Sequence, residues 1–355
     1  MSNKSVVMIC GLSLVRVLAN AQPVTVTSCG ADSSGRLDST AAFQRCLSNV
    51  PAGDLLIPYG TYRIAGSIFK TRNQNLVGMG SKASILKCQG TQVPCIVAAD
   101  TAGGPNNYSI STIQNLGIEG PGTSNGSIGV LVGGDPSSTI VSKTAFGDSV
   151  NFAGIRITGF NHGVQWGNNA YANKFFQCSI FENGSGLYAP TGLQNSGEAI
   201  SVTDSDIFNN REYGIEDHAN FEWMIQGTSF DYNSTAFVFY GSRIHLTNCH
   251  FEQQGAQVFF QPYGHAILSI RDSEILVQAA TGQEKYILSL WPQSLAIAID
   301  DVSVWSNHPV QYFMRVQGQI GGSITNLHGN GNQKISALSD TASHAVISAV
   351  QAFPQ

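Results

Sequence analysis

Short segments that alternate apolar and polar residues recur along the middle of the chain about once every 21 to 27 residues. Each segment holds a strand pattern, a small or polar corner residue and an apolar residue just beyond it. The segments lie at 154–160, 176–181, 202–208, 226–230, 246–251 and 270–275. Because a fixed period of this size is typical of solenoids, and no helical spacing separates the segments, the pattern predicts a coil of short β-strands.

Turns rich in Asn and Gly follow these segments and lead into a second set of short strand patterns. This second set lies at 163–166, 186–188, 214–217, 237–240 and 257–260. Several short strands per period favour a coil of three strands. A β-sandwich is the alternative, but it does not predict the same corner residue once per period.

The N-terminal part has a different pattern. Asp38-Ser39-Thr40 is suited to cap a helix that runs to Leu47, and a strand pattern follows at 55–57. Together with 30–32 and 57–64, this stretch resembles the opening of pectate-lyase-superfamily proteins, although the Gly-Asp-Gly of the family pattern is missing. The resemblance implies an all-β fold: a right-handed, single-stranded parallel β-helix with an N-terminal capping helix. Pectate lyases, polygalacturonases and phage tailspikes share this fold.

The first residues predict export. Lys4, an apolar stretch at 6–18 and Ala-Asn-Ala at 19–21 form the pattern of a secretory signal, and the stretch is too short to span a membrane. We therefore expect a signal peptide at 1–21, an N-terminal cap with the first strands at 22–75, and a parallel β-helix domain at 76–355. The expected location is extracellular or periplasmic.

The amino-acid composition limits the classes of partner that this chain is expected to bind. The 355 residues are 42% hydrophobic and 12% charged, with a net charge of -5. No cluster of Lys and Arg stands out, so a nucleic-acid partner is not expected, and no later segment is suited to cross a membrane. We expect a polysaccharide partner and leave a monomer and a homotrimer open.

Six cysteines remain once Cys10 leaves with the signal. The local pairs predict two disulfides, Cys29 with Cys46 and Cys88 with Cys95. Cys178 and Cys249 are three coils apart, roughly 14 Å at the usual strand spacing, so we expect two free, buried thiols. No cysteine spacing resembles a zinc site, and no metal site is predicted.

The resemblance also assigns the strand that opens with Gly-Ile to the sheet that forms the floor of the substrate groove. Strand alternation then points one set of side chains inward (Val164, Leu187, Ile215 and Val258) and another outward (Gln165, Tyr188, Glu216 and Phe259). The corner residues are expected to stack inside the coil. They are Cys178, Ser205, Thr228, Cys249 and Ser273.

The densest polar run, from Asn209 to His218, marks the candidate site. Glycosidic cleavage needs a proton donor and a second carboxylate, and we predict that Glu216 is the donor, within reach of neighbouring polar groups. Asp217 alternates with Glu216, so a hydrogen-bonding role at the edge of the core is an equal alternative for it. The catalytic candidates are Glu216, Asp217, Asp231, Glu182, His218 and Arg211.

Aromatic rings on an exposed sheet suit the C-H faces of sugars. The candidates for substrate binding are Gln165, Trp166, Tyr188, Tyr232 and Tyr240. Trp166 shares its parity with Val164, so packing in the core is an equal interpretation.

These residues predict a secreted carbohydrate-active enzyme that cleaves a polysaccharide. A glycoside hydrolase is favoured because the site is richer in carboxylates than in bases. The alternatives are a polysaccharide lyase that acts by β-elimination on a uronic-acid glycan, and a glycan-binding β-helix without catalysis. No cofactor is expected for a hydrolase, whereas a lyase could use Ca²⁺ to neutralise the uronate carboxyl group.

Overall fold

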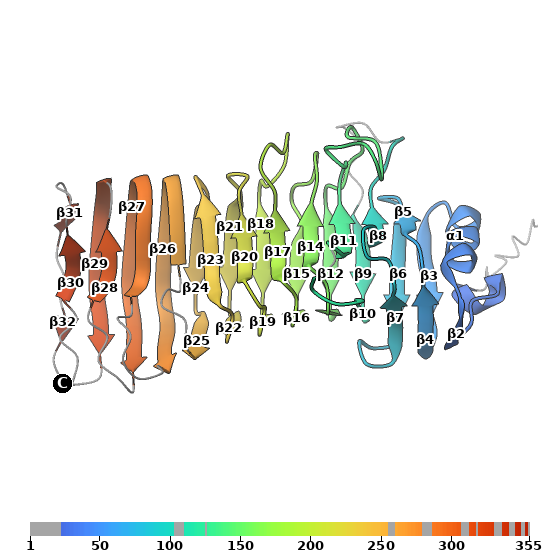
Figure 1. Ribbon diagram of the computed structural model, residues 1–355, viewed down its shortest axis with the longest axis horizontal. Helices are drawn as coiled ribbons and strands as arrows, with labels where there is room; N and C mark the ends of the chain where they lie inside the picture. The colour runs from blue at the N-terminus through green and yellow to red at the C-terminus, as the bar shows by residue number, and fades with distance from the viewer. Residues whose placement is uncertain are drawn as a thin grey trace, which may run out of the picture.

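The computed structural model describes residues 23–102, 110–124, 126–254, 260–278, 286–306, 312–316, 319–329, 336–340, 345–348 and 352–353. The signal peptide predicted at 1–21, and the inward and outward positions predicted for Val258 and Phe259, lie outside the described residues. The chain forms a parallel β-helix, which confirms the predicted fold class: every pairing between named strands is parallel. Figure 1 shows the coils stacked along the long axis, with helix α1 at one end and strands β30 to β32 at the other.

Each coil contributes one strand to each of three sheets. The first sheet contains β5 (Ile68–Lys70), β8 (Pro94–Ala98), β11 (Ile128–Val132), β14 (His162–Trp166), β17 (Ser185–Ala189), β20 (Tyr213–Asp217) and β23 (Thr235–Tyr240). The second contains β1 (Val24–Thr25), β3 (Gly53–Ile57), β6 (Gln74–Gly78), β9 (Ser111–Gln114), β12 (Val150–Ala153), β15 (Lys174–Phe176), β18 (Ile200–Thr203), β21 (Glu222–Gln226) and β24 (Arg243–Thr247).

The third sheet contains β2 (Ser34–Asp38), β4 (Gly60–Ile64), β7 (Ser84–Cys88), β10 (Gly117–Glu119), β13 (Arg156–Thr158), β16 (Ser179–Phe181), β19 (Asp206–Phe208), β22 (Ser229–Asp231) and β25 (His250–Gln254). The long strand β26 (Phe260–Gln278) pairs in turn with β23, β24 and β25. The stack continues through β27 (Tyr286–Ser306), β28 (Tyr312–Val316), β29 (Gln319–Gly329), β30 (Ser336–Asp340), β31 (Ala345–Ser348) and β32 (Ala352–Phe353). Parallel pairing begins before Leu76, because β3 already pairs with β6.

Strand alternation fills the core as predicted. Val164, Leu187 and Ile215 are fully buried in adjacent strands of the first sheet. The five corner residues predicted to stack inside are buried too: Cys178, Ser205, Thr228, Cys249 and Ser273. Left-handed backbone precedes several of these corners, as at Gln177 and Asp204, and this conformation turns the chain sharply from the second sheet into the third.

A ladder of buried asparagines joins the third sheet to the first. Asn183, Asn210 and Asn233 occupy equivalent turns, and the Nδ2 atom of each of the first two donates to Oδ1 of the next, at 3.2 and 2.9 Å. The same Oδ1 atoms accept backbone N–H groups of the turn before. Because buried polar groups need partners, the ladder holds the turn geometry and with it the positions of both sheets.

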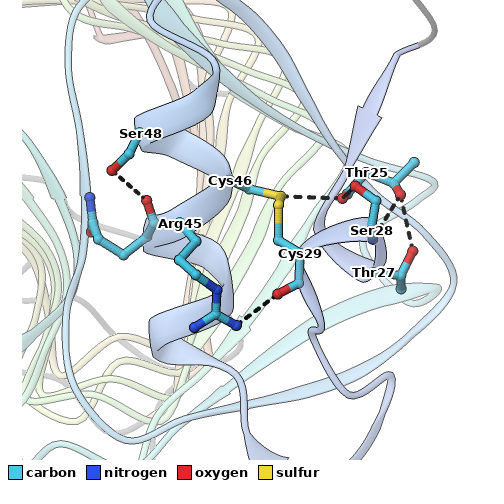
Figure 2. Close-up of a disulfide and its surroundings, with 8 residues drawn as sticks. Thr25, Thr27, Ser28, Cys29, Arg45, Cys46 and Ser48 are labelled. Carbon is cyan, nitrogen blue, oxygen red and sulfur yellow. Dashed lines mark hydrogen bonds between the residues drawn. A yellow bond between two sulfur atoms is a disulfide. The ribbon is translucent and has the colours of Figure 1, made fainter.

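The N-terminal end is closed by α1 (Thr40–Asn49), which confirms the predicted capping helix. Its buried side chains include Phe43 and Leu47. A disulfide joins Cys46 of this helix to Cys29 at the end of the 3-10 helix η1 (Val26–Cys29), and Arg45 donates to the carbonyl of Cys29 at 2.8 Å (Figure 2). Sequence reasoning predicted this bridge.

The other cysteine predictions are also confirmed. Cys88 and Cys95 form the second disulfide. Cys178 and Cys249 are free and buried. Within the described part of the chain, no helix is long and apolar enough to cross a lipid bilayer.

Candidate functional site

The outer face of the first sheet carries a hydrogen-bonded acid and histidine at mid-helix. Glu216 on β20 faces outward, as predicted from its parity, and its side chain is 15% exposed. Oε1 of Glu216 lies 2.8 Å from Nε2 of His218, and Oε2 accepts a hydrogen bond from the Ser185 hydroxyl at 2.5 Å. His218, which follows β20, and Ser185 on the neighbouring strand β17 therefore define the position of this carboxylate.

These contacts keep Glu216 ionised. Burial by itself would raise the pKa of Glu216, but the hydrogen bonds from His218 and Ser185 outweigh burial and bring the pKa below its ordinary value of 4.5. An ionised carboxylate only accepts hydrogen bonds, so the proton in the Glu216–His218 contact sits on Nε2 of His218. The role of proton donor predicted for Glu216 does not suit this environment, which favours a base or nucleophile.

Aromatic side chains flank this pair in a continuous row along the sheet. We define the aromatic row as His162, Tyr188, His218, Tyr240 and Tyr263. Successive ring centroids are 3.9, 6.2, 4.6 and 4.4 Å apart, and the first and last contacts are stacked. Tyr188 is half-buried and Tyr240 is 38% exposed, so both tyrosines predicted on this face do lie there.

His162 was not selected from the sequence, although it occupies the outward position at the start of β14. Its ring stacks on Tyr188, and its Nε2 atom lies 2.7 Å from the side-chain amide of Asn161. Burial lowers the pKa of His162 to about 4, against the opposing charges of Glu216 and Glu212. The imidazole is therefore neutral near pH 7 and supplies a flat, uncharged surface.

Glu212 is the second carboxylate on this side of the sheet. It lies in the turn before β20 and pairs with Arg211 at 2.7 Å, with both side chains 51% exposed. Burial raises the pKa of Tyr213, and the negative charges of Glu216 and Glu212 raise it further. Both carboxylates therefore act on the Tyr213 hydroxyl. The sequence run 209–218 contained Glu212, but a count of polar residues did not single it out. Arg211 is its ion-pair partner.

Two predicted site residues are corrected by burial. Trp166 is fully buried and packs edge-on against Trp223, and its Nε1 atom donates to Asn173 at 3.0 Å, so the core interpretation holds and the sugar platform does not. Asp217 is also fully buried and accepts hydrogen bonds from Trp223 and Ser242 at 2.9 and 2.6 Å. Of the two roles expected for Asp217, the structure supports hydrogen bonding inside the core, because strand alternation turns its carboxylate inward.

Three other candidates lie away from Glu216. Asp231 is on β22 of the third sheet, and Tyr232, which follows it, donates to Glu252 at 2.5 Å. Glu182 is exposed in the turn after β16. Glu216 was expected within reach of Glu182, Asp231, Arg211 or His218, and the structure pairs it with His218. Asp231 instead ends strand β22 of the third sheet, and Glu182 follows strand β16 of that sheet. Gln165 is half-buried on the outer face of the first sheet, in register with Tyr188, as predicted.

The chain is similar in sequence to a family of known proteins. The family described as rhamnogalacturonase A/epimerase, pectate lyase-like matches residues 24–258 of the 355. No match is found among the curated proteins.

Three solved structures share the fold. The catalytic unit of a thermostable α-1,3-glucanase from Streptomyces thermodiastaticus is 16% identical with a TM-score of 0.54, over 90% of this chain and 65% of the glucanase chain. The A-module of a mannuronan C-5 epimerase from Azotobacter vinelandii is 13% identical with a TM-score of 0.56, over 92% of this chain and 100% of the module. The enzymatically active domain of tailspike protein 4 from bacteriophage CBA120 is 14% identical with a TM-score of 0.63, over 90% of this chain and 45% of the tailspike chain.

At these identities the structural likeness shows the fold and leaves the reaction open. The chain spans less than two thirds of the glucanase unit and less than half of the tailspike domain. The family match covers well over half of the sequence and includes every strand of the first sheet from β5 to β23. The chain therefore belongs to the rhamnogalacturonase A/epimerase, pectate lyase-like family.

Proposed function

We propose that this protein is a secreted carbohydrate-active enzyme that hydrolyses a polysaccharide bound along the outer face of the first sheet. The observation that carries the proposal is the position of Glu216: an ionised, hydrogen-bonded carboxylate in the middle of the aromatic row. The family name and the glucanase among the structural neighbours point to the same class of substrate.

The aromatic row supports a chain-like ligand. It runs over five neighbouring coils, those of β14, β17, β20, β23 and β26. At the usual spacing of about 4.8 Å between strands, the row therefore extends over roughly 19 Å. Because the rings of the row stack on one another, a sugar would contact the exposed C–H edges and hydroxyl groups of the tyrosines. A polymer lying along the sheet would contact Tyr188, His218 and Tyr240 in sequence.

Hydrolysis assigns separate roles to the two carboxylates. Glu216, ionised at neutral pH, either activates a water molecule or attacks the anomeric carbon directly. Its hydrogen bonds from His218 and Ser185 hold it in one orientation. In this proposal Glu212, in the turn before β20, is the proton donor to the leaving oxygen, a role that requires the bound glycan to break its 2.7 Å ion pair with Arg211 so that the carboxyl group can take up a proton.

One observation favours a second candidate, β-elimination. Because Nε2 of His218 donates to Glu216, its Nδ1 atom carries the lone pair, and a carboxylate that orients a histidine in this way makes it a general base. Such a base would remove the proton next to a uronate carboxyl group. A lyase would further need a cation to neutralise that carboxyl group, and Ca²⁺ is suited to this role.

The test begins with a binding screen against neutral and uronic-acid glycans, followed by incubation of each bound glycan with the protein. Hydrolysis is expected to release reducing ends without ultraviolet absorbance. New ends that absorb in the ultraviolet would establish elimination and overturn hydrolysis. A glycan that binds with the aromatic row intact but is never cleaved would overturn both reactions and leave a binding protein.

A further inference from the structure

A second cluster of ionisable side chains lies on the outer face of the third sheet, away from the aromatic row. Asp231 ends β22, and Glu252 lies beside it in register on the parallel neighbour β25. His250 is two residues before Glu252 on the same strand, so both side chains point to the same side. One atom from each of these three residues lies within 4.8 Å of the others.

The histidine of this cluster is oriented by a further carboxylate. Nδ1 of His250 lies 3.1 Å from Oε2 of Glu274 on β26. An ionised carboxylate only accepts, so Nδ1 carries the proton, and the lone pair of Nε2 points toward the other two acids. A carboxylate behind a histidine is the usual arrangement of metal-binding imidazoles, because it fixes the ring and the tautomer.

The Nε2 atom of His250 is separated from the carboxylates of Asp231 and Glu252 by enough space for an ion. Nε2 lies 3.9 Å from Oδ1 of Asp231 and 3.8 Å from Oε2 of Glu252, both too long for a hydrogen bond. A tetrahedral ion with bonds of about 2.0 to 2.2 Å sets its ligand atoms roughly 3.3 to 3.6 Å apart. The two distances from Nε2 need to shorten by a few tenths of an ångström, and the three ligand atoms, which lie within 4.8 Å of one another, need to close by about an ångström at most.

The carboxylates themselves carry a second, independent indication. Oδ2 of Asp231 accepts from Ser229 at 2.8 Å, but Oδ1 is buried without a hydrogen-bond partner. A buried carboxylate oxygen without a donor is costly, and a cation removes that cost.

We propose that Asp231, His250 and Glu252 bind a divalent transition-metal ion, with zinc as the first choice. One imidazole nitrogen and two carboxylate oxygens suit Zn²⁺ and its first-row neighbours, whereas Ca²⁺ prefers six to eight oxygen ligands. The fourth position stays open to water. The ion would tie β22 to β25, and Glu274 would extend the tie to β26.

The test measures metal binding and does not depend on the proposed activity. The tag-free full chain is freed of metal with a chelator and titrated with Zn²⁺ against a chromophoric competitor. We expect one tight site. Its zinc affinity should fall at least about a hundredfold in His250→Gln and about ten- to a hundredfold in Glu274→Gln. His245→Gln is the matched control, because His245 is exposed on β24 of the second sheet. Circular dichroism checks that each variant folds.

Two further readouts keep the proposal falsifiable. Zn²⁺ at about a hundredfold excess over Kd should raise Tm by roughly 5 °C in the unsubstituted protein and not in His250→Gln. Co²⁺ should give visible absorption bands that the same substitution removes. Equal zinc affinity in His250→Gln and the unsubstituted chain would overturn the site. Equal affinity for Ca²⁺ and Zn²⁺ would overturn the metal class, and no binding of any of these ions would overturn the proposal.

Discussion

The two outer faces use the same residue types in opposite order and arrive at different chemistry. On the first sheet, Glu216 on β20 and His218 just after this strand are two residues apart and bond directly at 2.8 Å. On the third sheet, His250 and Glu252 have the same spacing, but Nε2 of His250 lies 3.8 Å from Oε2 of Glu252. Here Nδ1 of His250 contacts Glu274, and Oε1 of Glu252 accepts from Tyr232. The surrounding partners, and not the spacing, decide whether a histidine and an acid pair with each other or leave room for an ion.

The neighbours of each cluster separate the faces further. Stacked rings surround the Glu216–His218 pair, which suits a sugar polymer. Carboxylates surround His250, which suits a cation. Two functions on one coil are compatible because each sheet faces solvent in a different direction.

The largest expected effect is at Glu216. Glu216→Gln keeps the shape of the side chain, and its single amide oxygen can accept from either His218 or Ser185, but the substitution removes the charge and the basicity. Turnover of the cleaved glycan should fall by about 10²- to 10⁴-fold, with the circular dichroism spectrum unchanged. Glu222→Gln on the second sheet is the matched control. Turnover within a factor of a few of the unsubstituted protein in Glu216→Gln would remove this residue from the catalytic site.

Next in size is Asp217, which lies between Glu216 and His218 but points into the core. Asp217→Ala leaves the indole of Trp223, the hydroxyl of Ser242 and two backbone N–H groups without their acceptor. The free energy of unfolding should fall by about 3 kcal/mol in denaturant titration. Loss of less than about 1 kcal/mol, comparable with an exposed substitution, would contradict the structural role of Asp217.

A smaller effect is expected at Tyr240, whose ring stacks on Tyr263 at 4.4 Å. Tyr240→Ala removes a sugar platform of the aromatic row, and a contact worth about 1 kcal/mol would raise KM about fivefold with less change in kcat. Tyr240→Phe keeps the ring and should remain near the unsubstituted value. If KM were unaffected in Tyr240→Ala, the glycan would have to lie elsewhere than over this end of the row.

The smallest effect is on the pH dependence of stability. The pKa of Glu216 is lower in the folded chain than its ordinary value of 4.5. Its ionised form therefore contributes stability that is fully present above the unfolded pKa and is lost as the pH falls through the folded pKa. The difference in Tm between the unsubstituted protein and Glu216→Gln should stay constant above about pH 5. Below about pH 5, the Tm of the unsubstituted protein should fall relative to that of Glu216→Gln. A shift in the opposite direction would mean a raised pKa.

Much of the interior could be predicted because strand parity is a local property. Alternation along 213–217 places Ile215 and Asp217 inside and Glu216 outside, and the structure agrees. The same parity predicted the core position of Trp166. The two disulfides and the two free thiols followed from spacing along the chain and along the coil.

The grouping of site residues was decided by the tertiary structure. Asp231 and Glu182 lie close to Glu216 in coil order, but their strands end in the third sheet, and the length and conformation of each turn determine which face a strand joins. His162 joins Glu216 only because β14, β17 and β20 stack in register, which aligns residues about 50 positions apart. The sequence by itself determined a coiled parallel fold and the direction of side chains such as Ile215 and Glu216, since both depend on local alternation. Which outward residues meet depends on register between coils, and only packing of the whole stack sets that register.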